Sequence, residues 1–421
     1  LRCAHSTAVR GVEIRGVAEH CCEKMVPRVL LGALAISCAF AVQEDSGNEV
    51  AAAGGAGDAD AVPAEREGAR RLMTLQESLG LSDAEEQTIG KPWNYQQKFD
   101  PNHFFRSSQW APTLYALPEG VCDLNDSHKQ LIDQVDVWGG AAKTAPRIFC
   151  GVYTYHANHD TKIKAIKETW ASRCDGFVAF SDQVDLAVPS FKIKHEGPEE
   201  WGNMWQKSRA IWKYIDRHYI NDFDWFVLGG DDIFLIIENL RKYLLSDDIK
   251  KAAGGFKDGG SVPMYLGRRF RPKGNNDRIF NSGGAAYLLN QKSVRLLASH
   301  LDDPSCNPHQ KCSWEDVNVA ACLRQHGVVA HDTRDGLGRE LFHPFTPGQH
   351  LMYRVPKTNP EKDWYVDYSI DLKIGRECCS RNSLSFHYVD ENLMRRLYHL
   401  VYSCPKAPVD LPHVDMAAGK A

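Results

Sequence analysis

The sequence predicts an α/β fold with a mainly parallel sheet flanked by helices. Strand patterns alternate with helix patterns from residue 147 onward, which is the order expected when helices connect parallel strands. Hydrophobic residues make up 43% of the chain, enough to bury a packed core. With 421 residues, the chain has room for one large domain plus an appendage, or for two to three average domains.

The expected elements follow from local patterns of apolar residues. In chain order they are a strand at 148–154, a helix at 160–170, a strand at 176–181, a helix at 205–219, a strand at 224–228 and a helix at 236–244. Asp160 is the candidate N-cap of the first helix. In the second helix, Ile211, Tyr214 and Ile215 lie on one face, as a helix that packs on a sheet requires.

An apolar run at residues 29–42 predicts entry into the secretory pathway. Lys24 and Arg28 precede the run, and Ala39-Phe40-Ala41 offers a cleavage site. The run is shorter than the ~20 residues of a comfortable membrane span, so residues 25–45 are either a signal anchor or a signal peptide. Both interpretations send the rest of the chain into the lumen.

The remaining regions are assigned by composition. Residues 1–24 form an uncertain leader, and residues 46–146, which begin with an Ala/Gly/Asp-rich stretch, form a stem or linker. The ordered domain is expected at residues 147–405, followed by a tail at 406–421. Asn125 begins an Asn-Asp-Ser acceptor for N-glycosylation, a modification that requires the lumen.

Charge and cysteine content narrow the function classes. The formal net charge of −4 gives no reason to expect nucleic acid or an anionic membrane surface as a partner. The chain has 13 cysteines, and nine of them are scattered beyond residue 120, without the paired spacing of a zinc site. Such cysteines favour disulfides and an oxidising compartment over buried free thiols.

The expected strand at 224–228 leads directly into Gly229-Gly230-Asp231-Asp232. Ligands bind at the carboxyl ends of strands in open α/β sheets, and two glycines allow a tight turn with close ligand approach. Two carboxylates there would hold a hard divalent cation, and the cation would hold a diphosphate. A solvated Gly-Asp turn is the plainer interpretation of this segment alone, so a cation site needs support from other segments.

Several segments supply that support through their order and spacing. They are 164–170, 224–232, 265–270, Asn281-Ser282-Gly283-Gly284 with 285–287, Glu315-Asp316-Val317, Phe342-His343-Pro344-Phe345, Cys378-Cys379 and 385–389. Across about residues 147–404 these segments resemble the core 1 β1,3-galactosyltransferases. That group is a branch of the β1,3-glycosyltransferase family, which also includes fringe-type enzymes.

The resemblance implies a GT-A glycosyltransferase fold, which is Rossmann-like, and UDP-galactose as the donor. It also implies Mn²⁺ as the metal, inversion at the anomeric carbon, and a type II Golgi membrane protein with a lumenal catalytic domain. The resemblance further implies a hexosyltransferase that acts in protein O-glycosylation.

The resemblance assigns the metal ligands. Asp232 matches the main ligand, and His387 matches the second protein ligand, whose neutral imidazole suits Mn²⁺. Asp231 is a further candidate metal ligand and is also expected to bind the nucleotide-sugar. On its own segment, His387 would be taken for a satisfied core histidine; His343 and His350 are further candidate ligands. Gly230 stands where family members usually carry the first of three aspartates, and Asp231 is the residue placed to replace it.

Glu315 and Asp316 open the helix expected after Ser313, a candidate N-cap. Taken alone, two acids in a first turn stabilise the helix dipole. An inverting transfer also needs a carboxylate that takes the proton from the attacking hydroxyl. The resemblance assigns this catalytic base to Asp316 and a donor-sugar contact to Glu315.

Further candidate residues lie next to these motifs. Those expected to bind the nucleotide-sugar are Thr154, toward the uridine; Lys167 and Lys207, toward the diphosphate and the acidic turn; and Gly283 and Gly284, beside the sugar. Arg268 and Arg269 are expected to bind the donor or the acceptor. The resemblance also suggests the disulfides Cys378–Cys379, Cys150–Cys174, and Cys306 or Cys312 with Cys322.

Together the motifs and the resemblance predict transfer of galactose from UDP-galactose, in β1,3 linkage, to N-acetylgalactosamine on Ser or Thr of glycoproteins. Two alternatives stay open: a fringe-like β1,3-transferase with another donor or acceptor, and a non-catalytic chaperone of the transferase. Gly230 keeps the chaperone in view, whereas the retained acidic residues and His387 oppose it. The expected partners are a glycoprotein or glycopeptide acceptor and, through an uncleaved anchor, the membrane; a homodimer is also open.

Overall fold

The structure is a computed structural model that describes residues 120–140, 145–185, 187–272, 275 and 277–410. The predicted leader at 1–24, the signal segment at 25–45 and most of the stem lie outside the described residues, as does the tail beyond residue 410. Within the described ranges, no helix combines the length and the apolar character that a membrane crossing requires.

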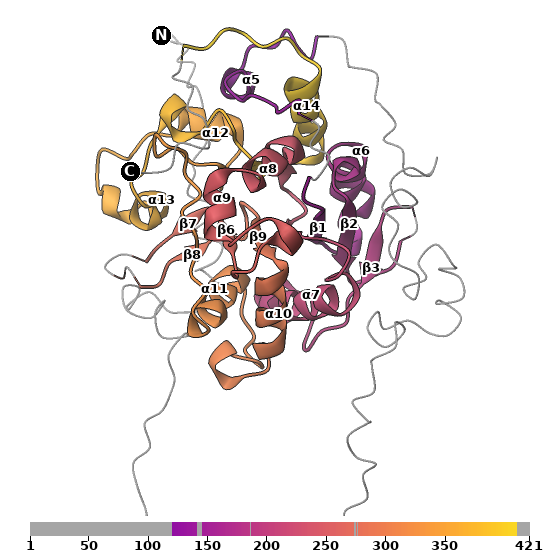
Figure 1. The fold of residues 1–421 in the computed structure, drawn as a ribbon. Helices are drawn as coiled ribbons and strands as arrows, with labels where there is room; N and C mark the ends of the chain where they lie inside the picture. The colour runs from indigo at the N-terminus through magenta and orange to yellow at the C-terminus, as the bar shows by residue number, and fades with distance from the viewer. Residues whose placement is uncertain (1–119, 141–144, 186, 273–274, 276, 411–421) are drawn as a thin grey trace, which may run out of the picture. The chain divides into compact units, whose positions relative to one another are not determined.

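The main sheet has six strands in the order β3-β2-β1-β4-β9-β6 (Figure 1). Its strands are β1 (Ile148–Tyr153), β2 (Gly176–Ser181), β3 (Ser190–Lys192), β4 (Trp225–Gly230), β6 (Tyr265–Gly267) and β9 (Tyr287–Asn290). Strands β3, β2, β1 and β4 are parallel, whereas β9 pairs antiparallel with β4 and with β6. The predicted α/β fold with a mostly parallel sheet is therefore confirmed.

The remaining strands form two small sheets. The first joins β10 (Phe342–His343), β11 (Ser385–Phe386) and β5 (Phe234–Leu235), and the second joins β7 (Arg269–Phe270) and β8 (Phe280–Asn281). Because β5 begins two residues after Asp232, its antiparallel pairing with β11 brings the residues after Phe386 next to the acidic segment.

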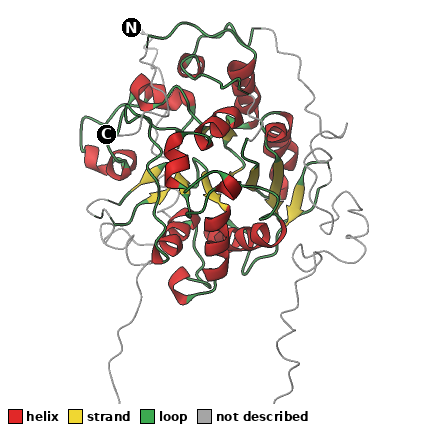
Figure 2. Ribbon diagram, in the orientation of Figure 1, coloured by secondary structure: helices red, strands yellow, loops and turns green. Residues whose placement is uncertain are grey.

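Helices cover both faces of the main sheet (Figure 2). They are α5 (Ser127–Ile132), α6 (Lys164–Glu168), α7 (Met204–His218), α8 (Ile237–Leu244), α9 (Asp247–Ala252), α10 (Gln291–His300), α11 (Glu315–Gln325), α12 (Pro347–Met352), α13 (Trp364–Tyr368) and α14 (Glu391–Tyr402). Alternate residues of each central strand point to opposite faces. Cys150 of β1 packs in the core that contains α6, α8 and α14, whereas Phe149 packs in the core that contains α7, α10 and α11.

Residues 120–140 belong to the folded unit, although the sequence pattern assigns them to a stem that ends at 146. Leu131, Ile132 and Val135 are fully buried in the core. Cys122 forms a disulfide with Cys404, just after α14. The boundary drawn at residue 147 is therefore too late, because the burial of this short segment depends on contacts with distant parts of the chain.

Four disulfides join cysteines of the described residues: Cys122–Cys404, Cys150–Cys174, Cys306–Cys322 and Cys378–Cys379. Of the two partners considered for Cys322, the structure pairs Cys306. The Cys122–Cys404 bridge has no counterpart among the expected pairs. Asn125, the glycosylation candidate, is exposed, so its side chain is accessible to modification.

Two predicted helix caps are wrong. Asp160 lies inside a short π-helix, His159–Ile163, whose N-cap is Asn158, so Asp160 is not the N-cap residue. Helix α11 begins after Trp314, which is its N-cap and makes no side-chain capping bond. Ser313 is therefore one residue too early, and the two acids still open the helix as predicted.

Candidate active site

The acidic segment lies at the carboxyl end of β4, at the centre of the main sheet. Strand β4 continues through both glycines, since Gly229 pairs with Val152 and Gly230 with Tyr153 of β1. The prediction of a glycine turn is therefore wrong. The glycines are needed for space instead, because a Cβ at Gly229 would lie 2.9 Å from the Cδ1 atom of Ile233.

Gly230 controls the space around Asp232. A Cβ at residue 230 would lie 2.8 Å from the Oδ1 atom of Asp232 and 3.4 Å from the ring of Tyr153. The first distance is shorter than real Cβ contacts, so a side chain at 230 would displace the Asp232 carboxylate. Glycine at this position is compatible with the observed orientation of Asp232.

Asp232 and His387 meet, although 155 positions separate them in the sequence. The Nε2 atom of His387 lies 3.3 Å from the Oδ1 atom of Asp232. On its other side, the His387 ring donates from Nδ1 to the carbonyl oxygen of Pro344 at 3.3 Å. Because a carbonyl can only accept, Nδ1 carries a proton and Nε2 is the nitrogen directed at the carboxylate.

The backbone after β11 orients this histidine. Strand β11 ends at Phe386, so His387 lies just beyond the strand. Tyr388 adopts a left-handed conformation with φ 57°, and its ring stacks on that of His387 with centroids 3.9 Å apart. A non-glycine residue in this region is uncommon, and here it turns the chain so that the imidazole faces Asp232.

The pKa of Asp232 reflects two opposing influences. Burial would raise the pKa of this carboxyl, but the neighbouring His387 and Lys162 hold it below its usual value. The Asp232 carboxylate is therefore ionised, a condition that suits a cation ligand.

Asp231 is bound by the protein itself. Its Oδ2 atom accepts hydrogen bonds from the Thr154 hydroxyl and the Asn158 amide, both at 2.6 Å. Its Oδ1 atom pairs with the ammonium of Lys162 at 3.0 Å. Thr154 and Asp231, both predicted to contact the ligand, therefore contact each other, and Asp231 serves to position the end of β1.

Lys162 is the lysine that contacts the acidic segment. Lys167, predicted for this role, donates to the carbonyl oxygen of Ala187 at 2.8 Å. Lys207 is buried and donates to the carbonyl of Thr154 and to Glu199, so it braces the residue that in turn binds Asp231. Sequence reasoning missed Lys162 because the matched segment begins at residue 164, two positions later.

Glu315 and Asp316 lie in the first turn of α11. The backbone N–H groups of Gly283 and Val317 donate to Asp316, at 2.9 and 2.8 Å. The Tyr287 hydroxyl donates to Glu315 at 3.0 Å. Burial raises the pKa of Asp316, and burial together with the charge of Asp316 raises the pKa of Glu315 well above its usual value.

Gly283 and Gly284, the two predicted glycines of the 281–287 segment, contact the acid pair and His387 respectively. A Cβ on Gly283 would lie 2.3 Å from the Oε1 atom of Glu315, and a Cβ on Gly284 would lie 2.4 Å from the Cε1 atom of His387. The glycines therefore make room for two protein side chains. The same absence of side chains lets both groups approach one backbone segment.

Tyr153, at the end of β1, is a site residue that sequence reasoning missed. Burial raises its pKa well above the usual value, and the charges of Glu315, Asp316, Asp232 and Asp231 raise it further. The tyrosine is therefore a neutral group between the two carboxylate pairs. Its position opposite Gly230 in the β1–β4 register is the signal that would have identified it, once the strand pairing is known.

The two predicted arginines have protein partners. Arg268 is buried, pairs with Glu340 and donates to the Ser369 hydroxyl. Arg269 pairs with Asp332 at 2.7 Å. Both side chains thus stabilise the region around β7, and neither is directed at the acidic segment in these contacts.

His343 and His350, the further metal candidates, form a separate buried cluster with the disulfide-bonded Cys379. His343 contacts the Ser383 hydroxyl at 2.8 Å, and burial lowers the pKa of His350 to about 3. Their rings pack edge to face at 5.1 Å, as neutral core side chains.

Comparison with known proteins indicates the class of enzyme to which this chain is similar. The chain is 30% identical over 258 residues to glycoprotein-N-acetylgalactosamine 3-beta-galactosyltransferase 1 of Xenopus laevis, a match that covers 61% of this chain and 66% of that protein. It is 27% identical over 199 residues to chondroitin sulfate synthase 3 of Homo sapiens, covering 45% of this chain and 22% of that protein. A beta-1,3-glucosyltransferase of Homo sapiens is 24% identical over 223 residues, or 52% of this chain and 40% of that protein.

These relatives are glycosyltransferases, and each is matched over no more than about two thirds of its length, the longest match covering 66%. No protein-family model matches the chain. The chain is thus similar to glycosyltransferases, and among these three relatives the Xenopus laevis galactosyltransferase shares the longest stretch with it.

Proposed function

We propose that this protein is an inverting, metal-dependent β1,3-galactosyltransferase of the GT-A fold. It transfers galactose from UDP-galactose to N-acetylgalactosamine linked to Ser or Thr of glycoproteins. The observation that carries the proposal is the approach of His387 to Asp232 at 3.3 Å, beside the carboxylates of Glu315 and Asp316. The name of the Xenopus laevis relative describes the same donor sugar and acceptor.

The donor set fits a divalent transition metal. An imidazole nitrogen and a carboxylate oxygen face each other, and the other ring nitrogen of His387 donates to a backbone carbonyl, the arrangement typical of metal-binding histidines. Imidazole and carboxylate together suit Mn²⁺. Asp232 and His387 would hold this ion, and the bound ion would offset the charge that develops on the departing diphosphate.

The chain's own residues account for the proton and for the orientation of the reactants. The Asp316 carboxylate takes the proton from the 3-hydroxyl of the acceptor sugar as that oxygen attacks the anomeric carbon of galactose and UDP leaves. Its raised pKa makes it a stronger base than an exposed aspartate. The bonds from Gly283 and Val317 fix the direction of the carboxylate.

Lys162 supplies a positive charge at the carboxyl end of β4. Its ammonium pairs with Asp231, and the charges of Asp231 and Asp232 contribute to raising its pKa, so it stays charged at neutral pH. A cation held there by the protein stabilises a leaving diphosphate without reorganisation during the reaction. In this proposal Lys162 has the role that the sequence pattern assigned to Lys167.

The test is a donor panel on the purified full chain. Transfer to an N-acetylgalactosamine-bearing peptide should require Mn²⁺ and should be fastest with UDP-galactose. Folded protein without turnover on any UDP-sugar would instead favour a chaperone of the transferase. The retained geometry around Asp232 and His387 argues for catalysis.

A second candidate function is a β1,3-transferase with another donor or acceptor. The relatives include a chondroitin sulfate synthase and a glucosyltransferase, and sugar specificity rests on few contacts. In the donor panel, turnover restricted to a different UDP-sugar would identify this function.

The proposed location is the Golgi lumen, in a type II membrane protein anchored through residues 25–45, or the secretory lumen if that segment is cleaved. The four disulfides support an oxidising compartment. The proposed partner is a glycoprotein acceptor, and the chain acts as a monomer or a homodimer.

A further inference from the structure

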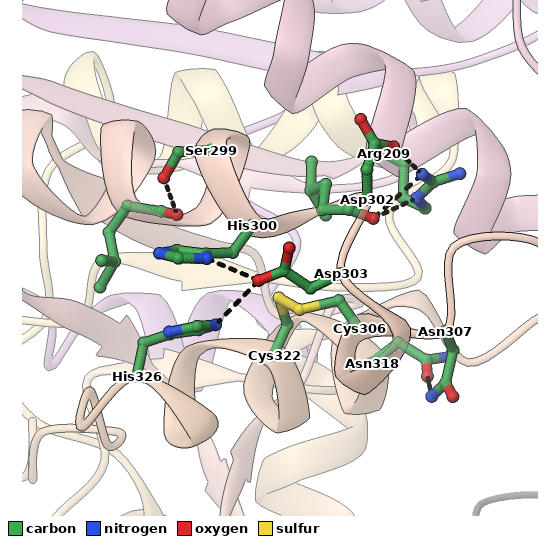
Figure 3. Close-up of a disulfide and its surroundings, with 12 residues drawn as sticks. Arg209, Ser299, His300, Asp302, Asp303, Cys306, Asn307, Asn318, Cys322 and His326 are labelled. Carbon is green, nitrogen blue, oxygen red and sulfur yellow. Dashed lines mark hydrogen bonds and ion pairs between the residues drawn. A yellow bond between two sulfur atoms is a disulfide. The ribbon is translucent and has the colours of Figure 1, made fainter. Parts of the chain in front are cut away.

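A second group of metal-ligating side chains lies at the opposite end of α11 from Glu315 and Asp316. His300 is the last residue of α10, Asp303 lies in the turn that follows, and His326 comes directly after α11 (Figure 3). One ligand atom from each of these three residues lies within 4.8 Å of the other two. The catalytic proposal uses none of them.

The geometry converges on one carboxylate oxygen. The Oδ2 atom of Asp303 lies 2.6 Å from Nδ1 of His300 and 3.9 Å from Nε2 of His326. The two imidazole rings stack with centroids 3.6 Å apart and an interplanar angle of 20°. Figure 3 shows both rings directed at Asp303 from the same side.

The local electrostatics favour a cation. Helices α10 and α11 both end here, and the carbonyl end of each helix carries a partial negative charge. The adjacent carboxylate of Asp302 is neutralised by Arg209 and Lys213, at 2.7 and 2.6 Å. Asp303 faces the two histidines instead, so its charge adds to that of the helix ends.

One ring nitrogen lacks a hydrogen-bond partner within the described part of the chain. The Nε2 atom of His326 is buried and makes no hydrogen bond to another described residue, since Asp303 Oδ2 lies 3.9 Å away, beyond hydrogen-bond distance. In the tautomer that carries its proton on Nδ1, the Nε2 lone pair of His326 faces the Asp303 carboxylate, which is unfavourable. Two protonated imidazoles stacked at 3.6 Å would repel each other. A single metal cation between the three groups removes both problems.

The group is held in place before any ion binds. The Cys306–Cys322 disulfide ties the turn after Asp303 to α11. The backbone N–H of Asp303 donates to the His300 carbonyl, and that of Cys306 donates to the Asp303 carbonyl, both at 2.9 Å. Ligands on such a rigid frame bind metal with little loss of conformational freedom.

We propose that His300, Asp303 and His326 form a Zn²⁺ site that links the C-terminal ends of α10 and α11. Zn²⁺ prefers nitrogen and oxygen ligands in tetrahedral geometry, and three protein ligands leave one position for water. The side chains are 34%, 44% and 22% exposed, so the ion reaches the site from solvent. Zn–ligand distances of about 2.0–2.2 Å require only small rotations of the three side chains.

The experiment separates this site from the candidate active site. The full chain carrying Asp232→Asn and His387→Gln, with disulfides intact, is titrated with Zn²⁺ by calorimetry. We expect one bound equivalent and a Zn²⁺-dependent rise in Tm. Adding His326→Gln should weaken binding by at least about 10- to 100-fold, the range seen even for supporting residues of metal sites.

His331→Gln is the matched control, since His331 also pairs with an aspartate, Asp248, at 3.0 Å but belongs to no cluster of three metal-ligating groups among the described residues. It should leave Zn²⁺ affinity unchanged. Asp303→Asn serves as the second ligand variant if His326→Gln unfolds. Equal affinity in the ligand variant and its parent would overturn the proposal. Binding that appears only after reduction would also overturn it, because Cys306 and Cys322 thiolates would then be the ligands.

Discussion

Gly284→Ala tests the proposed metal site without replacing either of its ligands, Asp232 and His387. The new Cβ would lie 2.4 Å from Cε1, 2.6 Å from Nδ1 and 2.9 Å from Nε2 of His387. Favourable carbon contacts need about 3.5 Å, so the ring must retreat by about 1 Å. A misplacement of about 1 Å in a catalytic site costs about 10²-fold in rate.

We therefore expect Gly284→Ala to weaken Mn²⁺ binding and to lower kcat/KM by about 10²-fold. The fold should survive, because overpacking of this kind costs about 1–3 kcal/mol and residue 284 has no left-handed backbone. Mn²⁺ titration by calorimetry, initial rates and thermal unfolding measure the three effects. Gly139→Ala is the control, since a Cβ there meets nothing within 4 Å.

A double-mutant cycle sharpens the result. Once Gly284→Ala has displaced the imidazole, His387→Ala should cause little additional loss, because both changes remove the same interaction. Mn²⁺ affinity equal to that of the parent in Gly284→Ala, or full additivity with His387→Ala, would refute the assignment of His387 as a ligand.

Three further predictions follow from the acid pair and the disulfides. Asp316→Asn should lower kcat by about 10²–10⁴-fold with UDP binding nearly intact, and surviving activity would place the base elsewhere. Since burial raises the pKa of Asp316, the kcat/KM of the parent should increase with pH, and the midpoint of that increase should lie above the ordinary pKa of an aspartate. Glu315→Gln should increase the free energy of unfolding at neutral pH. Burial raises the pKa of Glu315 in the folded state, so this carboxyl lowers the stability of the parent progressively as pH rises above its unfolded pKa of about 4.3. In urea titrations, the free energy of unfolding of the variant minus that of the parent should therefore grow between pH 4 and pH 7, and a constant difference would contradict this reasoning. Cys122→Ser with Cys404→Ser should lower the free energy of unfolding by about 2–5 kcal/mol, and an unchanged midpoint without reductant would show that this bridge contributes little.

The alternation of strands and helices was predictable because each element carries its own apolar pattern. The direction of β9 was not, since a short apolar run such as Tyr287–Asn290 fits a parallel or an antiparallel neighbour equally well. The ordered part before residue 147 was missed for a related reason. Helix α5 has six residues, too few for a clear period, and its burial depends on partners far along the chain.

The site was predictable where a residue's chemistry stands in a recognisable motif. Asp232, His387, Glu315 and Asp316 were named from such segments, and the structure brings them to one end of the sheet. Lys162 was missed because a helical lysine acquires its role only from proximity to Asp231, which the sequence does not display.

Arg268 illustrates the opposite error. A paired arginine motif indicates anion binding, but this side chain is buried against Glu340, 72 positions later in the chain. A partner at that separation is invisible to local pattern analysis. The same limitation applies to Tyr153, whose neighbours come from β4 and α11.

The bond between Cys122 and Cys404 has a mechanical consequence. Tension that arrives along the polypeptide from the amino-terminal side is passed at Cys122 to the end of α14, and the covalent link prevents α5 from being peeled off the domain. A protease that cuts between α5 and β1 would likewise leave both fragments attached. Release of the amino-terminal segment would then require reduction as well as cleavage.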